Sequence, residues 1–127
     1  MIQRNTPELF ARDVDEAVRF YTEVLGFRLA HRVPEDSSQA AEWALVEQGN
    51  ATFMFEKPAE PRSPYGVVFY LAVEDIEETA AALRSRGAMV QGPVDQWYGQ
   101  REATVTDPSG YRLVFTAPVP AKQPAQA

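Results

Sequence analysis

The sequence contains no cysteine and only one histidine, His31, among its 127 residues. Without cysteine the chain forms no disulfide bond and performs no thiol chemistry, which fits a reducing compartment. We therefore expect a cytoplasmic protein. No Ser-His-Asp set, no paired acid and base and no glycine-rich phosphate loop is visible in the sequence.

Long apolar runs are also missing, so we expect no membrane span. The first nine residues are polar and contain a proline, unlike a secretory signal. The net charge of −6 argues against nucleic acid as a partner, because phosphates would be repelled. An acidic chain suits a cationic small molecule, although the charge also serves solubility alone. At this length we expect one domain with its own core.

The stretch from Asp13 to Phe27 predicts a capped helix that runs into a strand. Asp13 can accept a hydrogen bond from the first-turn amides, and Glu16 lies three residues later, close to a capping box. Gly26 stands where a left-handed residue ends a helix. Between them the apolar residues follow one helical face: Val14, Ala17, Val18, Tyr21 and Leu25.

The same plan returns in the second half of the chain. Asp75 caps a second helix, Glu78 follows three residues later, and Gly87 ends it. The predicted buried stripe comprises Ile76, Ala80 and Leu83. This repetition predicts two similar modules.

Alternating and apolar segments around these helices predict four strands in each half. They cover residues 8–12, 27–33, 42–47 and 51–56, then 66–73, 88–91, 101–106 and 111–116. The segment 66–73 is nearly continuous in apolar residues, so we expect it to be buried on both faces. Residues 92–99 are expected to form a loop that carries Trp97 and Tyr98.

We therefore predict an α+β fold of two βαβββ modules, at about 5–57 and 65–117, joined by the linker 58–64. Residues 118–127, rich in proline and alanine, are expected to be a disordered tail. One helix on each four-stranded sheet leaves the other face open, and two such faces side by side would form a cleft for a ligand.

Three segments resemble the vicinal oxygen chelate superfamily, which includes glyoxalases, extradiol dioxygenases and bleomycin resistance proteins. They are LFARDVDEAVRFYTEVLGF, VEDIEETAAALRSRGA and YGQREATVTDPSGYRLVF. The Trp-Tyr-Gly-Gln-Arg-Glu segment is most similar to the metal-free bleomycin resistance branch. The resemblance implies a homodimer that binds a small aromatic or cationic molecule.

The metal enzymes of that superfamily hold one divalent ion through His, Gln or Glu side chains on four strands. Counting from the motifs carries those positions over to Thr6, Met54, Val68 and Val114. A threonine, a thioether and two valines cannot hold such an ion. We therefore expect no metal, no cofactor and no catalytic residue, and interpret His31 as a surface or edge-strand side chain.

Strand parity from those four positions selects the side chains that face the cleft. Parity selects six expected ligand-binding residues: Phe10, Met54, Glu56, Tyr70, Arg112 and Val114. Glu102 and Trp43 are added to them, although no ligand position fixes the parity of Trp43. The loop aromatics Trp97 and Tyr98 complete the expected site, because large aromatics in loops often contact ligands. The two loop aromatics also fit a lid or a dimer contact. The opposite parity predicts core: Leu9, Ala11, Phe53, Phe55, Val67, Phe69, Leu113 and Phe115.

Two other functions remain open at this point. The first is a divalent-metal lyase, isomerase or dioxygenase with unconventional ligands such as Glu8, Glu56 and Glu102. The second is a structural or regulatory domain that binds another protein. The resemblance favours a binding and sequestration protein for an antibiotic-like molecule, and such a role needs only affinity.

Overall fold

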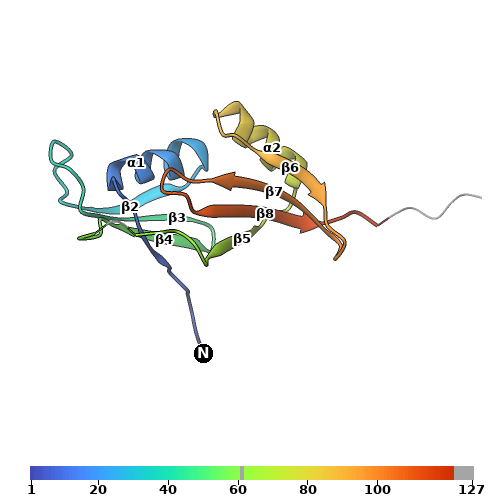
Figure 1. Cartoon of the computed structure of the whole chain (residues 1–127), viewed down its shortest axis with the longest axis horizontal. Coiled ribbons are helices and arrows are strands. Elements are labelled where there is room, and N and C mark those ends of the chain that lie inside the picture. Colours follow the sequence, from blue (N-terminus) through green and yellow to red (C-terminus); the bar gives the residue numbers. More distant parts are fainter. Residues whose placement is uncertain (61, 122–127) are drawn as a thin grey trace, which may run out of the picture.

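The computed structural model describes residues 1–60 and 62–121, and it consists of two sheets with one helical segment on each. Both helices lie on the same side of the molecule (Figure 1). The first module comprises β1 (Glu8–Phe10), α1 (Val14–Arg19), the π-helical turn η1 (Phe20–Val24), β2 (Arg28–Val33), β3 (Trp43–Gln48) and β4 (Ala51–Glu56). The second comprises β5 (Val68–Ala72), α2 (Ile76–Ser85), β6 (Gln91–Asp95), β7 (Gln100–Thr106) and β8 (Arg112–Pro118). The predicted α+β fold of two βαβββ modules is confirmed.

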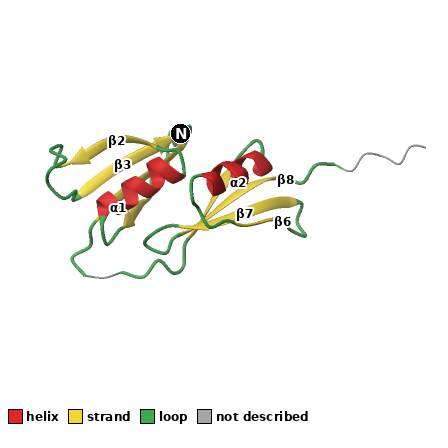
Figure 2. Cartoon of the chain, turned by 90° about the horizontal axis from the view of Figure 1, so that it is seen from above, coloured by secondary structure: helices red, strands yellow, loops and turns green. Residues whose placement is uncertain are grey.

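The two sheets have the same strand order, which confirms that the second half repeats the first. The orders are β1-β4-β3-β2 and β5-β8-β7-β6, and in the described chain no strand of one sheet pairs with the other. The pairs β1–β4 and β5–β8 are parallel, and the remaining pairs are antiparallel. Seen from above, each helix lies over its own sheet (Figure 2).

Both helices begin at the predicted aspartates. The carboxylate of Asp13 accepts a hydrogen bond from the Glu16 amide at 3.0 Å, and Asp75 accepts one from the Glu78 amide at 3.0 Å. The Glu16 carboxylate binds the Arg12 guanidinium instead of returning to the cap. The first helix widens to π-helical turns at η1, which its sequence pattern does not predict, before Gly26 takes a φ of +82°.

The core lies between the helices and the sheet faces below them, and strand parity predicts it well. Among the residues expected there, Val67 is the exception, because it precedes β5 and is 48% exposed. Aromatic rings join the modules: Phe53 of β4 and Phe69 of β5 meet edge to face with their centroids 5.1 Å apart. The core is therefore shared between the two halves.

A buried hydrogen bond also joins the modules. The Tyr21 hydroxyl donates to the Asp107 carboxylate at 2.9 Å, and both residues are buried. The same carboxylate accepts from the amides of Ser109 and Tyr111 in the β7–β8 turn. Burial raises the pKa of Asp107, and burial also raises the pKa of the Tyr21 hydroxyl. This arrangement fixes the turn of one module against the helix of the other.

The expectation that segment 66–73 is buried on both faces is wrong. Its strand, β5, is an edge strand, and within it Val68 is 38% exposed and Tyr70 is 60% exposed. Phe69 and Leu71 pack against the core, whereas the alternate side chains Val68 and Tyr70 point to the opposite face of the sheet, where they are exposed within the described chain. The apolar residues of this segment therefore include some that form an exposed apolar surface in the single chain.

Two element boundaries also differ from the sequence prediction. The strand expected at 88–91 is β6, at Gln91–Asp95, inside the segment interpreted as a loop. Gly92 and Pro93 indicate a break, but an edge strand tolerates them at a register irregularity, which lies between Gln91 and Val94. Strand β8 extends to Pro118, so the first residue of the expected tail is ordered, and residues 122–127 lie outside the described residues.

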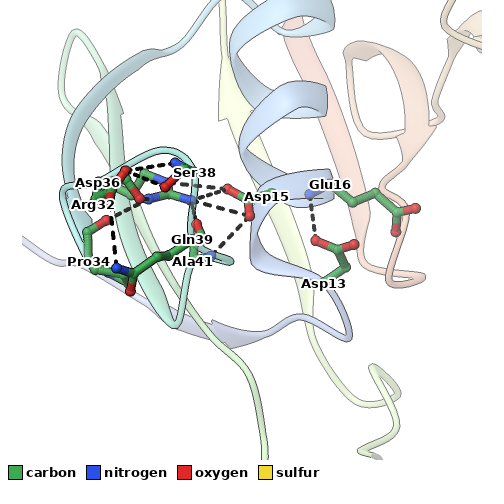
Figure 3. A network of polar contacts seen from close by, with 9 residues as sticks. All are labelled: Asp13, Asp15, Glu16, Arg32, Pro34, Asp36, Ser38, Gln39 and Ala41. Carbon is green, nitrogen blue, oxygen red and sulfur yellow. Dashed lines mark hydrogen bonds and ion pairs between the residues drawn. The ribbon is translucent and has the colours of Figure 1, made fainter.

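Arg32 organises the loop between β2 and β3 (Figure 3). Its guanidinium donates to the Asp15 carboxylate and to the carbonyls of Pro34, Asp36 and Gln39. Asp15 also accepts a hydrogen bond from the Ala41 amide at 2.9 Å. The Arg32 side chain is 11% exposed, so its guanidinium is largely shielded from water, whereas the Asp15 side chain is 32% exposed. This network fastens the loop to the first turn of α1.

We expect Arg32→Ala to lower the free energy of unfolding by about 1–3 kcal/mol, because Asp15 loses its ion pair and three carbonyls each lose a donor. Urea denaturation measures the change, and Arg28→Ala, which removes a more exposed arginine paired with Glu47, should have a much smaller effect. Equal losses in the two variants would contradict the role of the network.

The same network predicts that the free energy of unfolding depends on pH in the acidic range. The Ala41 amide, followed by Arg32, lowers the pKa of Asp15. A lowered folded-state pKa gives stability that is present above the unfolded pKa of about 4 and is lost as the pH falls through the folded value. Asp15→Asn should therefore make stability less dependent on pH below about pH 4 than in the parent chain.

None of the helices in the described part of the chain has the length and apolar character needed to cross a membrane.

Candidate functional site

The candidate site is the open face, which we define as the faces of both sheets opposite the helices. The register places Trp43 between Val33 and Glu56 on neighbouring strands, while Ala44 and Val46 are buried on the helix side. This settles the parity of Trp43, which lies on the open face. The expected site residues on this face are Trp43, Met54 and Glu56 in the first sheet, and Tyr70, Glu102, Arg112 and Val114 in the second.

The loop between β6 and β7 adds two aromatic side chains to the second sheet. The Tyr98 hydroxyl donates to the Glu102 carboxylate at 2.6 Å, and the Trp97 ring meets the Tyr98 ring edge to face at 5.4 Å. Glu102 is 8% exposed, whereas Trp97 is 94% exposed. The loop closes on itself, since the Gln96 amide donates to Gln100 and Gly99 takes a φ of +90°. Its turn thus presents an indole to solvent beside a sheltered carboxylate.

Glu102 accepts the hydrogen bond from the Tyr98 hydroxyl, and this contact changes the acidity of Tyr98. The hydrogen bond to Glu102 raises the pKa of Tyr98 to about 12, with burial and the Glu102 charge adding to it. Tyr98 therefore stays protonated and keeps donating near neutral pH. A carboxylate beside aromatic rings attracts a cation both by charge and through the ring faces.

Apolar side chains surround this pair on the second sheet. Tyr70 of β5 and Val94 of β6 are exposed, and Val114 lies between Tyr70 and Thr104 in the register. Val114 is 2% exposed, so a single chain offers little of its surface to a ligand. Arg112 is exposed at the start of β8. The second sheet thus carries an apolar patch with one cation and one sheltered anion.

The first sheet carries a smaller cluster with two carboxylates. Glu8 of β1 and Glu56 of β4 interact, and their hydrogen bond raises the pKa of Glu8, with burial and repulsion between the two charges adding to it. Trp43 lies beside these strands, with its ring centroid 5.7 Å from that of His31. His31 is exposed in the edge strand β2, as expected. Met54 is half-buried in the same face.

Phe10 does not share this environment, although its parity is that of the open face. The guanidinium of Arg62 covers the Phe10 ring, with its carbon 4.7 Å from the ring centroid. Phe10 instead lines a cavity under the segment that follows β4.

The four positions where the resemblance implies a divalent ion do not fit one. The Thr6 hydroxyl is hydrogen-bonded to the Thr52 hydroxyl at 2.8 Å, and the other positions are a thioether and two valines. The alternative ligands are separated, since Glu8 and Glu56 belong to the first sheet and Glu102 to the second. No group of three or more acidic or histidine side chains suited to a metal occurs in the part of the chain that the structure describes.

Sequence reasoning missed the contacts of three polar residues. The pairing of Asp107 with Tyr21 spans the two modules, and its only signal was the Asp-Pro-Ser-Gly turn. The alternating pattern places Arg32 in an ordinary strand, although the polar loop after it needs donors for its carbonyls. Arg62 lay in a proline-rich linker interpreted only as a connector.

Comparisons with known proteins agree with this architecture. The family model for the glyoxalase/bleomycin resistance protein/dioxygenase superfamily matches residues 3–115. A relative from Mycolicibacterium smegmatis (strain ATCC 700084 / mc(2)155) is 31% identical over 112 residues, covering 87% of this chain and 90% of the relative.

Two crystal structures show the same fold. TioX from Micromonospora sp. ML1 is 26% identical with a TM-score of 0.75, over 92% of this chain and 99% of TioX. TnmS3, an antibiotic binding protein from Streptomyces sp. CB03234, is 24% identical with a TM-score of 0.72, over 93% of this chain and 97% of TnmS3.

Proposed function

Because the chain belongs to the glyoxalase/bleomycin resistance protein/dioxygenase superfamily, we propose that it sequesters a small aromatic or cationic molecule on its open face. In this proposal the protein acts in the cytoplasm, without a metal ion, and leaves its ligand chemically unchanged. Sequestration needs only affinity, so no side chain has to transfer a proton or form a covalent bond.

The observation that carries the proposal is the group formed by Trp97, Tyr98 and Glu102. A tryptophan that is 94% exposed contributes nothing to the core of a single chain, and exposed aromatics in loops commonly contact ligands. The carboxylate next to it is 8% exposed and is held by Tyr98 at 2.6 Å, so it is already oriented. Stacking on the indole and attraction to Glu102 together favour a flat cation.

The open face also supports a homodimer. Val68, Tyr70 and Val94 on the second sheet and Tyr98 in the adjoining β6–β7 loop are exposed apolar side chains in the described chain. A second copy could bring the first sheet of one chain against the second sheet of the other. The acidic pair Glu8 and Glu56 would then face the side that carries Arg112. Ligand would be enclosed between the two faces.

The proposed ligand class combines this chemistry with the family analogy. The family description includes bleomycin resistance proteins, and TnmS3 is an antibiotic binding protein of the same fold. The fold alone does not fix a function, so the charge and the aromatic groups of the open face define the class. We therefore propose an antibiotic-like ligand.

The experiment is a binding and assembly study. Bleomycin, the planar cation proflavine and the neutral acridone are titrated calorimetrically, and sedimentation velocity gives the oligomeric state. We expect a dimer that prefers proflavine to acridone. A monomer at all concentrations would contradict the dimer, and the absence of binding by bleomycin and proflavine would contradict sequestration.

Trp97→Ala should weaken binding of the cationic ligand by about 1–3 kcal/mol if the indole stacks on it. The matched control is Tyr65→Ala, which removes another aromatic residue, 92% exposed but outside the sheets. This control should leave the dissociation constant unchanged. If the two variants bind alike, Trp97 is not part of the site.

A further inference from the structure

A cavity lined by cationic residues lies apart from the Trp97 loop. It has a volume of about 410 Å³ and is bounded by the end of β1, the segment that follows β4 and the β7–β8 turn. The cavity lining includes three apolar residues, Phe10, Pro58 and Pro108, and three cationic residues, Arg12, Lys57 and Arg62. Its volume falls within the range of small-molecule sites.

The charge of the cavity contrasts with that of the protein. The chain carries a net charge of −6, yet among the described residues that line this cavity three are cationic and none is acidic. Arg12 is bonded to the Glu16 carboxylate at 3.0 Å and 3.2 Å. Neither Lys57 nor Arg62 forms an ion pair among the residues that the structure describes. Two positive charges therefore remain available to an incoming anion.

The cavity also holds one of these cations in place. The Arg62 guanidinium lies over the Phe10 ring, with its carbon 4.7 Å from the ring centroid. Stacking on an aromatic face restricts the guanidinium plane and leaves the N–H groups on its edge free to donate. Pro58 and Pro108 have restricted backbones, so the apolar walls are stiff as well.

We propose that this cavity binds a small organic anion with a carboxylate or phosphate head and an apolar body. The edge of Arg62 matches the two oxygens of such a head, and Lys57 supplies a second charge. The apolar body packs against Phe10 and the prolines. The site is separate from the proposed function, because it selects the opposite charge and uses none of Trp97, Tyr98 or Glu102.

The test uses the full chain and four probes: benzoate, phenyl phosphate, inorganic phosphate and the neutral benzamide. We expect benzoate or phenyl phosphate to bind with a dissociation constant below about 1 mM at low salt and benzamide at least about tenfold more weakly. Inorganic phosphate, which lacks the apolar body, should bind more weakly than phenyl phosphate. Amide resonances of Phe10, Lys57 and Ser109 should shift in the NMR spectrum.

Two variants locate the site. Arg62→Gln and Lys57→Gln should each weaken binding of the anion by about fivefold or more, because each removes one charge from the cavity. Arg19→Gln removes the same charge from the exposed face of α1 and should change binding far less. Unchanged thermal melting of the variants confirms that they fold.

Three results would overturn the inference. The first is that neither benzoate nor phenyl phosphate binds at 10 mM, about the weakest affinity that such a site should show. The second is that benzamide binds as tightly as benzoate. The third is that Arg62→Gln and Arg19→Gln weaken binding of the anion equally. None of these results bears on the open face, whose cationic ligand is measured separately.

Discussion

Asp107→Ala should lower the free energy of unfolding by about 3–5 kcal/mol, as measured by urea denaturation. The substitution leaves the Tyr21 hydroxyl and the amides of Ser109 and Tyr111 without their acceptor. Tyr21 is fully buried, so its hydroxyl cannot turn to water. Each unsatisfied buried donor costs about 1–3 kcal/mol, and removal of a carboxylate disfavoured by burial offsets part of the sum.

Asp107→Asn is the matched control. Its amide oxygen can still accept from Ser109 and Tyr111, and its NH₂ group can donate to the Tyr21 hydroxyl, so the loss should stay below about 2 kcal/mol. If alanine and asparagine destabilise the protein equally, the carboxylate does not organise the turn.

The Asp107 variants also test a pH effect of opposite sign to that of Asp15. Burial raises the folded-state pKa of Asp107, so its contribution to stability is fully present below the unfolded value of about 4. That contribution is lost as the pH rises through the folded value. We therefore expect the free energy of unfolding of the parent chain to fall as the pH rises above about 4. Asp107→Asn should remove this decline.

Gly92→Ala should destabilise the protein by about 2–4 kcal/mol, because the added methyl group meets backbone that cannot easily move. A Cβ atom at this position would lie 2.5 Å from the carbonyl oxygen of Glu102 and 3.1 Å from the amide of Val94. The φ of +103° adds the strain of a left-handed conformation. The Arg84 guanidinium also holds the Gly92 carbonyl, so α2 fastens this irregularity of β6.

Gly87→Ala separates the two contributions. Gly87 has a similar φ of +92°, but apart from its neighbours along the chain no described atom lies within 4 Å of the added carbon. Its loss should therefore reflect the backbone strain alone, about 1–2 kcal/mol. Gly92→Ala should also weaken binding at the open face, because the clash falls on the strand that carries Glu102. If Gly92→Ala and Gly87→Ala lower the free energy of unfolding equally, the β7 backbone does not crowd Gly92 and the clash argument is wrong.

The sequence predicted the local features of the fold because each depends on neighbours along the chain. Asp13 and Asp75 cap helices through amides three residues away, and Gly26 and Gly87 take positive φ where the helices end. Alternation identified Phe53, Phe55 and Leu113 as core, since a strand places successive side chains on opposite faces. The failures at β5 and β6 arose where the outcome depends on whether a strand is at a sheet edge.

The site was predicted in its residue types but not in its contacts. Trp97, Tyr98 and Glu102 were all chosen as ligand-binding residues, yet only the fold of the loop shows that Tyr98 donates to Glu102. The cationic cavity was not predicted, because Phe10 and Arg62 are distant in sequence and meet only through the path of the linker.

Residue types and their spacing were enough to predict the two helices, their caps, the faces of most strands and the unsuitable side chains at the four positions where the resemblance implies metal ligands. All of these follow from residue type and from spacing over a few positions. Three features became visible only in the folded chain: β5 is an exposed edge strand, Asp107 joins the modules, and Lys57 and Arg62 line one cavity. These features bring together residues far apart in the chain, and their energies depend on burial, which local patterns do not encode.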